Sequence, residues 1–388
     1  MNPTNRETKK SHKVPQFILK NFASRSKHKI NKTKYFIYCF HKLEEKAYEL
    51  SLSDACAENK FYETILDKDM VKRIFGEDIL QENKRIAVKG IEQMFSKLED
   101  KAAPVIEKIV KDKSINDLKV KHKTILASFV AFQYLRTDYH KNNLRKIAAS
   151  DKEKRTEIAS VYGVELPKNE YDEMSFYADS EEGGKLLHSD SLLDKSLNKR
   201  IFLQIINKEW VLFEASRNNP FIIGDNPVVL HNDNKDYGFL GNLGLACKGI
   251  EIYFPLSSRL ALGFLCPSII AKIEESYKKE IDKLDSKISH YVPLCNLGKD
   301  DSIKIKSRQI IEKLEEKKKY LFEFKKETEL MQSSEIVNLG DERVIRLNCL
   351  QIAFSSRFIF SSKNDFSLVK RMIKDDPSFK SGVGIRIG

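Results

Sequence analysis

The fold is decided by the stretch Asn219-Pro220-Phe221-Ile222-Ile223-Gly224-Asp225-Asn226-Pro227-Val228-Val229-Leu230, in which two apolar runs surround a polar break. The runs Phe221–Ile223 and Val228–Leu230 predict short buried strands. Pro227 restricts the residue before it to an extended backbone, so Asp225 and Asn226 should leave a stiff turn in fixed directions. Such a turn can present a site, but Asp and Asn also cap their own backbone in ordinary turns. Both interpretations stay open on the sequence alone.

Strand signals continue on both sides of this stretch. Residues 208–213 carry the single tryptophan, and residues 250–264 read as two strands around a Pro-Leu-Ser turn. A hairpin is predicted for residues 34–52, where aromatic and β-branched side chains are frequent. Because the strands recur with short turns, we expect an antiparallel sheet built from 34–52 and 208–266.

Helical periodicity dominates the regions 82–149 and 340–362. Pro104 is expected to begin a new segment, and a long buried helix is expected over roughly 115–149. A second apolar helix is expected over 344–360. Its polar side chains fall at i, i+3 and i+7 and need partners if they are buried; they are Asn348, Gln351 and Ser355.

Two further segments have a different character. Residues 150–197 are polar and contain a Gly-Gly pair, which indicates an insertion or a mobile surface region. In 267–331 apolar residues recur every three or four positions among Lys and Glu, which predicts an antiparallel helical hairpin. We therefore predict an α+β body of residues 1–266 and 332–388, with an antiparallel sheet packed on central helices and the hairpin at 267–331 protruding as an arm.

The composition indicates a globular protein with an affinity for polyanions. The chain has 388 residues, 41% of them hydrophobic, and a formal net charge of +12. Such a charge favours nucleic acid as a partner, followed by an acidic membrane face. The same excess of Lys, Asn and Ile is also what codon bias in an AT-rich genome produces.

Cysteine usage and hydropathy bear on the compartment. The six cysteines are scattered, so neither a zinc knuckle nor a redox pair is indicated, and we expect them to be reduced. Residues 1–13 are polar and basic, and no eighteen apolar residues run together. The expectation is a cytoplasmic protein without a membrane span.

Polar side chains lie beside several of the apolar runs. His12 precedes a short helix predicted within residues 15–22, and Gln16 lies in its first turn. Gln133 and Arg136 lie three residues apart on one face of the long buried helix. A buried unpaired guanidinium is costly, so Arg136 needs either an internal carboxylate partner or an anionic ligand.

Several catalytic motifs are absent from the sequence. There is no Gly-rich phosphate loop followed by Lys and Ser or Thr, no Gly-x-Ser-x-Gly elbow and no His-Glu-x-x-His. The eight histidines do not cluster at metal-ligand spacing. The interval from Arg136 to His140 is one residue short of the Arg-x4-His pattern of helical-bundle ribonucleases. No metal or other cofactor is indicated by these patterns.

Four motifs carry a resemblance to a known family, namely His12-Lys13-Val14-Pro15-Gln16-Phe17-Ile18-Leu19-Lys20-Asn21-Phe22, Gln133-Tyr134-Leu135-Arg136-Thr137, Phe221-Ile222-Ile223-Gly224-Asp225-Asn226-Pro227-Val228 and Phe254-Pro255-Leu256-Ser257. In this order the chain resembles the bacterial DUF4238 family. The resemblance implies a conserved polar set at His12, Gln16, Gln133, Arg136, Asp225, Asn226 and Asn348. Ser258 stands where the family commonly has a second proline, and the arm at 270–331 is longer than the family pattern requires.

Six of these residues are expected to converge in one cleft, because buried polar groups need one another; they are His12, Gln16, Gln133, Arg136, Asp225 and Asn226. His12 is then the candidate acid or base, and Asp225 is the candidate general base or the partner of Arg136. The amides that would position substrate are Gln16, Gln133, Asn226 and Asn348. The function predicted first is nucleic-acid-directed hydrolysis, for instance by a nuclease effector in phage defence or a toxin system. The alternative is a non-catalytic scaffold that binds nucleic acid, or a protein through the arm at 270–331.

Overall fold

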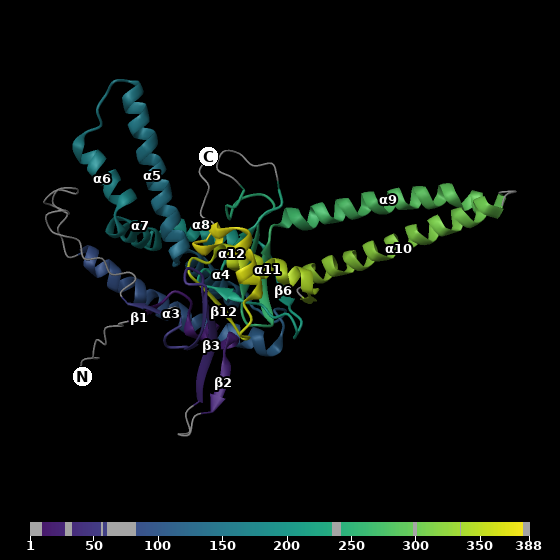
Figure 1. Ribbon diagram of the computed structural model, residues 1–388, viewed down its shortest axis with the longest axis horizontal. Coiled ribbons are helices and arrows are strands. Elements are labelled where there is room, and N and C mark those ends of the chain that lie inside the picture. Colours follow the sequence, from purple (N-terminus) through teal and green to yellow (C-terminus); the bar gives the residue numbers. More distant parts are fainter. Residues whose placement is uncertain are drawn as a thin grey trace.

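The computed structural model describes residues 10–27, 33–55, 57–59, 83–234, 242–297, 301–333 and 335–382. Figure 1 shows a body in which sheets and helices pack together, with one pair of long helices projecting from it. The architecture is α+β, as the sequence predicts.

The first sheet is built around the hairpin predicted within 34–52. The hairpin strands are β3 (Thr33–His41) and β4 (Lys46–Ser51), and β3 also pairs with β2 (Ser24–Lys27). β3 pairs further with β12 (Phe358–Ser361), which pairs with β7 (Ile223–Gly224). All of these pairings are antiparallel, and they join N-terminal, central and C-terminal parts of the chain.

The second sheet has the strand order β11-β6-β10-β9-β8. Its strands are β6 (Glu209–Glu214), β8 (Val229–His231), β9 (Glu251–Pro255), β10 (Leu260–Leu265) and β11 (Ile336–Asn338). Every residue of β10 is buried, which is expected of a strand near the centre of a sheet. Only β11 is parallel to its neighbour, β6. A separate two-stranded ribbon pairs β1 (Lys10–His12) with β5 (Ala57–Asn59).

The strands that were expected in one sheet thus form two sheets. The stretch from residue 219 to residue 230 explains why. Its two apolar runs become β7 and β8, which belong to different sheets. Only the residues between Gly224 and Val229 connect them, and the side chains of Asp225, Asn226 and Val228 within this connection are buried. The polar break is therefore the crossing point between the two sheets.

The described helices before residue 162 all contribute to the main hydrophobic core. They are α1 (Gln16–Leu19), the 3-10 turn η1 (Lys20–Phe22), α3 (Asn83–Asp112), α4 (Val120–Leu135) and α5 (Asp138–Val161). The ring of Phe129 in α4 lies 5.6 Å from that of Phe17 and 6.0 Å from that of Phe254. α4 is therefore the buried central helix that its apolar sequence predicts.

The boundaries of these helices differ from the predicted ones in two places. α3 continues through Pro104, because Ile106 and Ile109 just after it are fully buried and anchor the helix. The helix expected over 115–149 is interrupted at Arg136 and Thr137. The hydroxyl of Thr137 accepts a hydrogen bond from the backbone N–H of His140, which caps the start of α5.

The polar segment 150–197 is helical rather than irregular. After α5 it forms α6 (Lys168–Asp179), α7 (Glu181–Leu193) and α8 (Lys195–Ile206). The glycine pair lies inside α7, where a Cβ at Gly183 would lie 2.0 Å from the carbonyl oxygen of Phe176. Gly183 therefore allows α6 and α7 to approach closely. In Figure 1 this group of helices stands on the side of the body away from the long helix pair.

The projecting pair consists of α9 (Pro267–Leu297) and α10 (Asp301–Gln332), which run antiparallel as predicted for the arm. The side chain of Leu284 is buried between them, and Lys318 donates to Asp285 at 2.6 Å across the pair. The helix α9 continues through Pro293.

The chain ends with α11 (Asp341–Phe354), β12, α12 (Ser367–Asp375) and the 3-10 turn η3 (Pro377–Lys380). The helix predicted over 344–360 stops at Phe354, because Ser355 is extended and the following residues join the first sheet. Among the described helices, none is both long and apolar enough to cross a bilayer.

Candidate functional site

The polar stripe of α11 holds the crossing point between the sheets. The carboxamide of Asn348 accepts a hydrogen bond from the backbone N–H of Ile222 (3.0 Å) and donates to the carbonyl of Pro220 (3.0 Å). Gln351 repeats this pattern one turn later, with the N–H of Gly224 (2.9 Å) and the carbonyl of Pro227 (2.9 Å). Each amide therefore satisfies one donor and one acceptor of a buried backbone that has few sheet partners.

Asp225 lies at the centre of the crossing and is buried. Its carboxylate accepts hydrogen bonds from the backbone N–H groups of Ser356 (2.7 Å), Arg357 (2.8 Å) and Phe358 (3.1 Å). Burial and the negative charge of Asp138 raise the pKa of Asp225, and the charge of Lys13 and the backbone donors oppose this rise. These contacts direct the chain from α11 into β12, which is a positioning role.

Two of the predicted site residues keep unused hydrogen-bonding capacity. Asn226 is 1% exposed, and neither its side-chain nitrogen nor its oxygen has a partner among the described residues. Gln133 donates to the carbonyl of Lys13 at 2.8 Å, while its own oxygen lacks a described partner. Buried amides normally have all their polar atoms paired, so these two could take a further polar group.

A buried charge network surrounds Asp138, at the start of α5. Asp138 forms ion pairs with Lys13, Lys141 and Arg357. Burial acts against ionisation, but the three cations outweigh it and hold the pKa of Asp138 at about 2. The network thus joins the N-terminal segment, α5 and the turn after α11 around one carboxylate.

Lys42 is a second buried cation near Asp225. Its ammonium group donates to the carbonyls of Ile352 (2.8 Å) and Ser355 (2.6 Å) and to the hydroxyl of Ser355 (3.0 Å). Burial lowers the pKa of Lys42 to about 8, and the charge of Asp225 opposes this change. The lysine caps the C-terminal carbonyls of α11, which favour a cation.

Arg136 has the internal carboxylate partner that was one of its two predicted alternatives. Its guanidinium forms a salt bridge with Glu99 and lies 4.3 Å from the ring centre of Phe95, both on α3. His140 does not share this environment. It lies beside His188 with ring centres 5.9 Å apart, and burial lowers the pKa of His140 to about 3 and that of His188 to about 4.

Two of the predicted site residues, His12 and Gln16, lie near the N-terminus. His12 is in β1, but its side chain lies outside the described residues, while Gln16 is exposed in α1. The predicted segments do meet, because Lys13 contacts both Gln133 and Asp138 and its charge acts on Asp225. Two of the residues that meet, Lys13 and Asp138, are therefore sequence neighbours of the predicted site residues His12 and Arg136. The catalytic roles that the sequence suggests for His12, Arg136 and Asp225 stay predictions.

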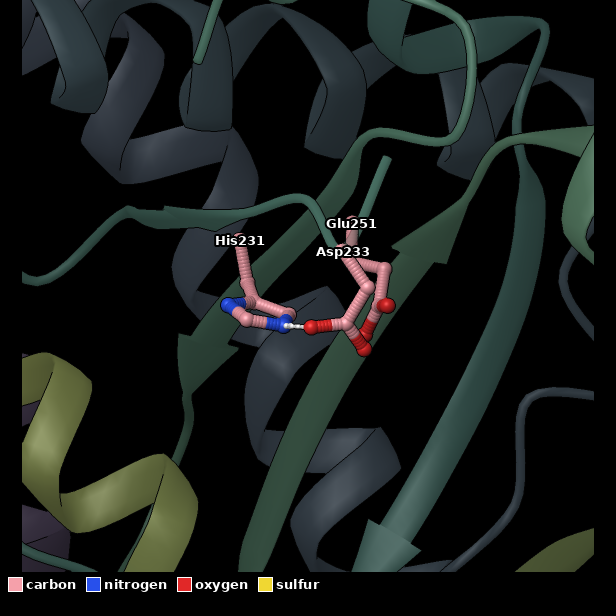
Figure 2. Close-up of side chains that lie close together, drawn as sticks. All are labelled: His231, Asp233 and Glu251. Atoms are coloured by element: carbon pink, nitrogen blue, oxygen red, sulfur yellow. Dashed lines mark hydrogen bonds and ion pairs between the residues drawn. The ribbon is translucent and has the colours of Figure 1, made fainter. Parts of the chain in front are cut away.

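A second group of titratable side chains lies at the edge of the other sheet, where β8 is the last strand. His231 of β8 and Glu251 of β9 are direct partners across the strand pair, so their side chains share a face. Asp233 follows two residues after His231 and joins them. One ligand atom from each lies within 4.8 Å of the others, and Figure 2 shows the three side chains turned toward one another. We call these three residues the edge cluster.

Two further residues contact the edge cluster. Nε2 of His231 lies 2.9 Å from Asp233, and the guanidinium of Arg346 on α11 donates to Asp233 at 2.9 Å and also contacts Nε2 of His231. The hydroxyl of Tyr253 donates to Glu251. Burial opposes ionisation of Asp233, but the hydrogen bond from Arg346 and the charges of His231 and Arg346 hold its pKa below the usual range. Imidazole, carboxylate and guanidinium together can transfer protons, bind anions or hold a cation.

The sequence predicts no histidine cluster at metal-ligand spacing, and none of these three residues is among the predicted site residues. The pattern alone could show that His231 ends one strand and Glu251 begins another. It could not show that the two are paired, because nineteen intervening residues leave the strand register open.

The comparisons give a family match. A family model described as a protein of unknown function (DUF4238) matches residues 10–365. No curated protein and no solved structure matches the chain. The matched range includes both sheets, the buried network around Asp138, the edge cluster and the arm.

Proposed function

We propose, from the premise that this chain belongs to the DUF4238 family of proteins of unknown function, that it is a nucleic-acid-directed hydrolase. The observation that carries this proposal is the contact between the His231 imidazole and the Asp233 carboxylate beside the half-exposed guanidinium of Arg346. An imidazole held by a carboxylate is a suitable proton acceptor, and a guanidinium binds phosphate oxygens. The same three residue types were expected from the sequence, at other positions.

In the proposed reaction, a water molecule attacks the phosphorus atom of a phosphodiester and His231 accepts the proton that the water loses. Asp233 orients the imidazole and stabilises the positive charge that it gains. Arg346 neutralises the non-bridging oxygens as negative charge develops on them. The bond from phosphorus to the leaving oxygen breaks, and that oxygen takes a proton from solvent.

The charge distribution supports a polyanionic substrate. Residues 267–331 contain 15 basic and 13 acidic side chains, so most of the net charge of +12 belongs to the rest of the chain. A positive body attracts a phosphate backbone within a screening length of about 8 Å at physiological salt. We place the reaction in the cytoplasm, as a nuclease effector in phage defence or a toxin system. The described cysteines suit a reducing compartment, since all five are free: Cys39, Cys247, Cys266, Cys295 and Cys349.

The second candidate function is a scaffold that binds a protein through the arm. The observation in its favour is that α10 exposes two aromatic side chains, Tyr320 at 67% and Phe322 at 64%. Exposed aromatic residues are enriched where proteins bind one another. A scaffold of this kind needs no chemistry at the edge cluster.

The test is to incubate the purified protein with labelled RNA, single-stranded DNA and duplex DNA, with EDTA and with magnesium. Variants His231→Ala and Arg346→Ala are compared with His290→Ala, which removes an exposed histidine on the arm. We expect cleavage of at least one substrate by the wild type and by His290→Ala, with a loss of about 100-fold in His231→Ala.

The same assay includes His12→Ala, because the sequence analysis assigned the acid or base to that residue. Cleavage that disappears in His12→Ala and persists in His231→Ala would move the site to the N-terminal segment. Salt-sensitive binding of nucleic acid, without cleavage by any of the proteins, would overturn the hydrolase and favour a non-catalytic scaffold that binds nucleic acid.

A further inference from the structure

We propose that the edge cluster of His231, Asp233 and Glu251 binds a divalent first-row cation, such as Mn²⁺ or Zn²⁺, in the place where the guanidinium of Arg346 now lies. The inference deepens the proposed function, because it concerns the same cluster. It is tested below by a measurement that requires no substrate.

The side chains of the edge cluster are suitable ligands for such a cation. One imidazole nitrogen and two carboxylates are ligand types that Mn²⁺ and Zn²⁺ share, and three protein ligands leave further coordination positions for water or substrate. Strand pairing fixes the distance between His231 and Glu251, which are cross-strand partners. The ligand atoms already lie within 4.8 Å of one another, so a cation between them requires only side-chain rotations.

Nε2 of His231 has two neighbours whose hydrogen-bonding requirements conflict. This nitrogen lies within hydrogen-bonding distance of an oxygen of Asp233, which only accepts, and of the guanidinium of Arg346, which only donates. One ring nitrogen carries either a proton or a lone pair, so it can satisfy one of these neighbours and not both. A cation bound to the lone pair of Nε2 and to Asp233 resolves the conflict, because both atoms then act as donors of electron pairs to the metal.

A cation already lies at the edge cluster, namely the guanidinium of Arg346. Its side chain is 54% exposed on α11, so the guanidinium can turn toward solvent without disturbing the core. The carboxylate of Glu251 is held by Tyr253, and only one of its oxygens is hydrogen-bonded among the described residues. Ligands held by such outer hydrogen bonds are better placed to coordinate a metal.

Cation binding changes the role of each residue in the proposed hydrolysis. A divalent cation held by these residues would make a bound water more acidic and so supply a nucleophile, where the metal-free form relies on His231 as base. Arg346 leaves the cluster and becomes available to a substrate phosphate. Replacement of the Arg346 guanidinium by a divalent cation would thus provide both the nucleophile, as a bound water, and a free arginine that binds the substrate phosphate.

The experiment measures Mn²⁺ binding to the full-length protein by electron paramagnetic resonance, without nucleic acid. We expect one site in the wild type, at least tenfold weaker binding in His231→Ala and Glu251→Gln, and about tenfold tighter binding in Arg346→Gln, which removes the competing charge. The matched control is Arg371→Gln, which removes an exposed arginine from α12 and should leave Mn²⁺ binding unchanged.

Circular dichroism verifies that each variant is folded. No Mn²⁺ binding in either the wild type or Arg346→Gln would overturn the cation site, as would equal effects of Arg346→Gln and Arg371→Gln. Mn²⁺ binding without cleavage of any nucleic acid leaves the cation site standing and removes the hydrolase. Cleavage in EDTA, together with no Mn²⁺ binding, would overturn the cation site and leave the hydrolase standing.

Discussion

Gly224 and Gln351, 127 residues apart in the sequence, are joined by a hydrogen bond of 2.9 Å from the backbone N–H of the glycine to the side-chain oxygen of the glutamine. This contact replaces part of a strand ladder at the place where the chain leaves one sheet for the other. A Cβ at Gly224 would lie 2.9 Å from Cβ of Ser355 and 3.0 Å from the carbonyl of Gln351, so only glycine allows α11 to approach this closely.

We predict that Gln351→Leu lowers the free energy of unfolding by about 2–5 kcal/mol, because it leaves the N–H of Gly224 and the carbonyl of Pro227 buried and unpaired. Denaturation in urea measures the loss. The control is Gln309→Leu, the same exchange at an exposed position of α10, which should change stability by less than about 0.5 kcal/mol. Equal effects of the two exchanges would show that the backbone contacts of Gln351 contribute little.

Asp225→Asn is predicted to destabilise the protein by about 2–4 kcal/mol, since the amide nitrogen would face backbone donors that the carboxylate now satisfies. Asp365→Asn is the control. Asp365 is exposed and accepts from the N–H of Ser367, a role that Asn fills nearly as well. If Asp225 is the general base suggested by the sequence, its variant will instead keep its stability and lose cleavage.

The fold class was predictable because periodicity reports local structure directly. The hairpin within 34–52, the antiparallel strands from 208 to 266 and the arm at 267–331 each follow from alternation or helical spacing within one continuous segment. The need of Asn348 and Gln351 for partners was also predictable, because a polar stripe on an apolar helix has to be satisfied.

The remaining features depend on contacts between distant segments. The polar composition of 150–197 suggested a surface region, yet ion pairs such as Lys152–Asp179 (2.6 Å) and Arg155–Glu170 (2.9 Å) join its helices. The site prediction selected Arg136, whereas the carboxylate that gathers the buried cations is Asp138, two residues later. Neither a cross-strand pair nor an ion pair over more than a hundred residues leaves a local pattern.

The two buried histidines predict a loss of stability in weak acid. His140 and His188 have folded-state pKa values of about 3 and about 4, below the unfolded value near 6.5, because burial opposes their charged forms. Between pH 6.5 and these folded-state pKa values, the unfolded state therefore binds more protons than the folded state. The free energy of unfolding should fall as pH drops below 6.5, by up to about 1.4 kcal/mol per pH unit for each histidine.

Urea denaturation at several pH values from 7 to 4.5 measures this dependence. His188→Gln should reduce the slope, because glutamine can still donate to the carbonyl of Leu135 that now lies 2.7 Å from the imidazole, and it does not titrate. The exposed His290→Gln should leave the slope unchanged. A wild-type slope that persists in His188→Gln would assign the acid sensitivity to other groups.

The buried pair of Lys13 and Asp138 predicts strong coupling between two segments 125 residues apart. Removing either charge alone, by Lys13→Met or Asp138→Asn, should cost about 3–5 kcal/mol, because the other charge stays buried with fewer partners. The double variant should cost clearly less than the sum of the single ones. Since the pKa of Asp138 is lowered to about 2, the stability that it contributes is present above pH 3.8 and is lost between pH 3.8 and 2. Additive costs in the cycle would indicate that the two charges do not interact.

Shortening the arm tests whether nucleic acid binds to the body or to the arm. Asp285 and Lys318 face each other at 2.6 Å, so residues 286–317 can be replaced by a short Gly-rich turn between them. The removed residues carry seven basic and five acidic side chains, a small part of the net charge of +12. We therefore expect the shortened protein to keep its melting temperature and to bind nucleic acid with nearly the same affinity and salt dependence, as measured by fluorescence anisotropy at several salt concentrations.

A companion variant keeps the full arm and changes Tyr320 and Phe322 to Ser. Nucleic-acid binding that fails in both variants would make the arm the binding element and contradict a site on the body.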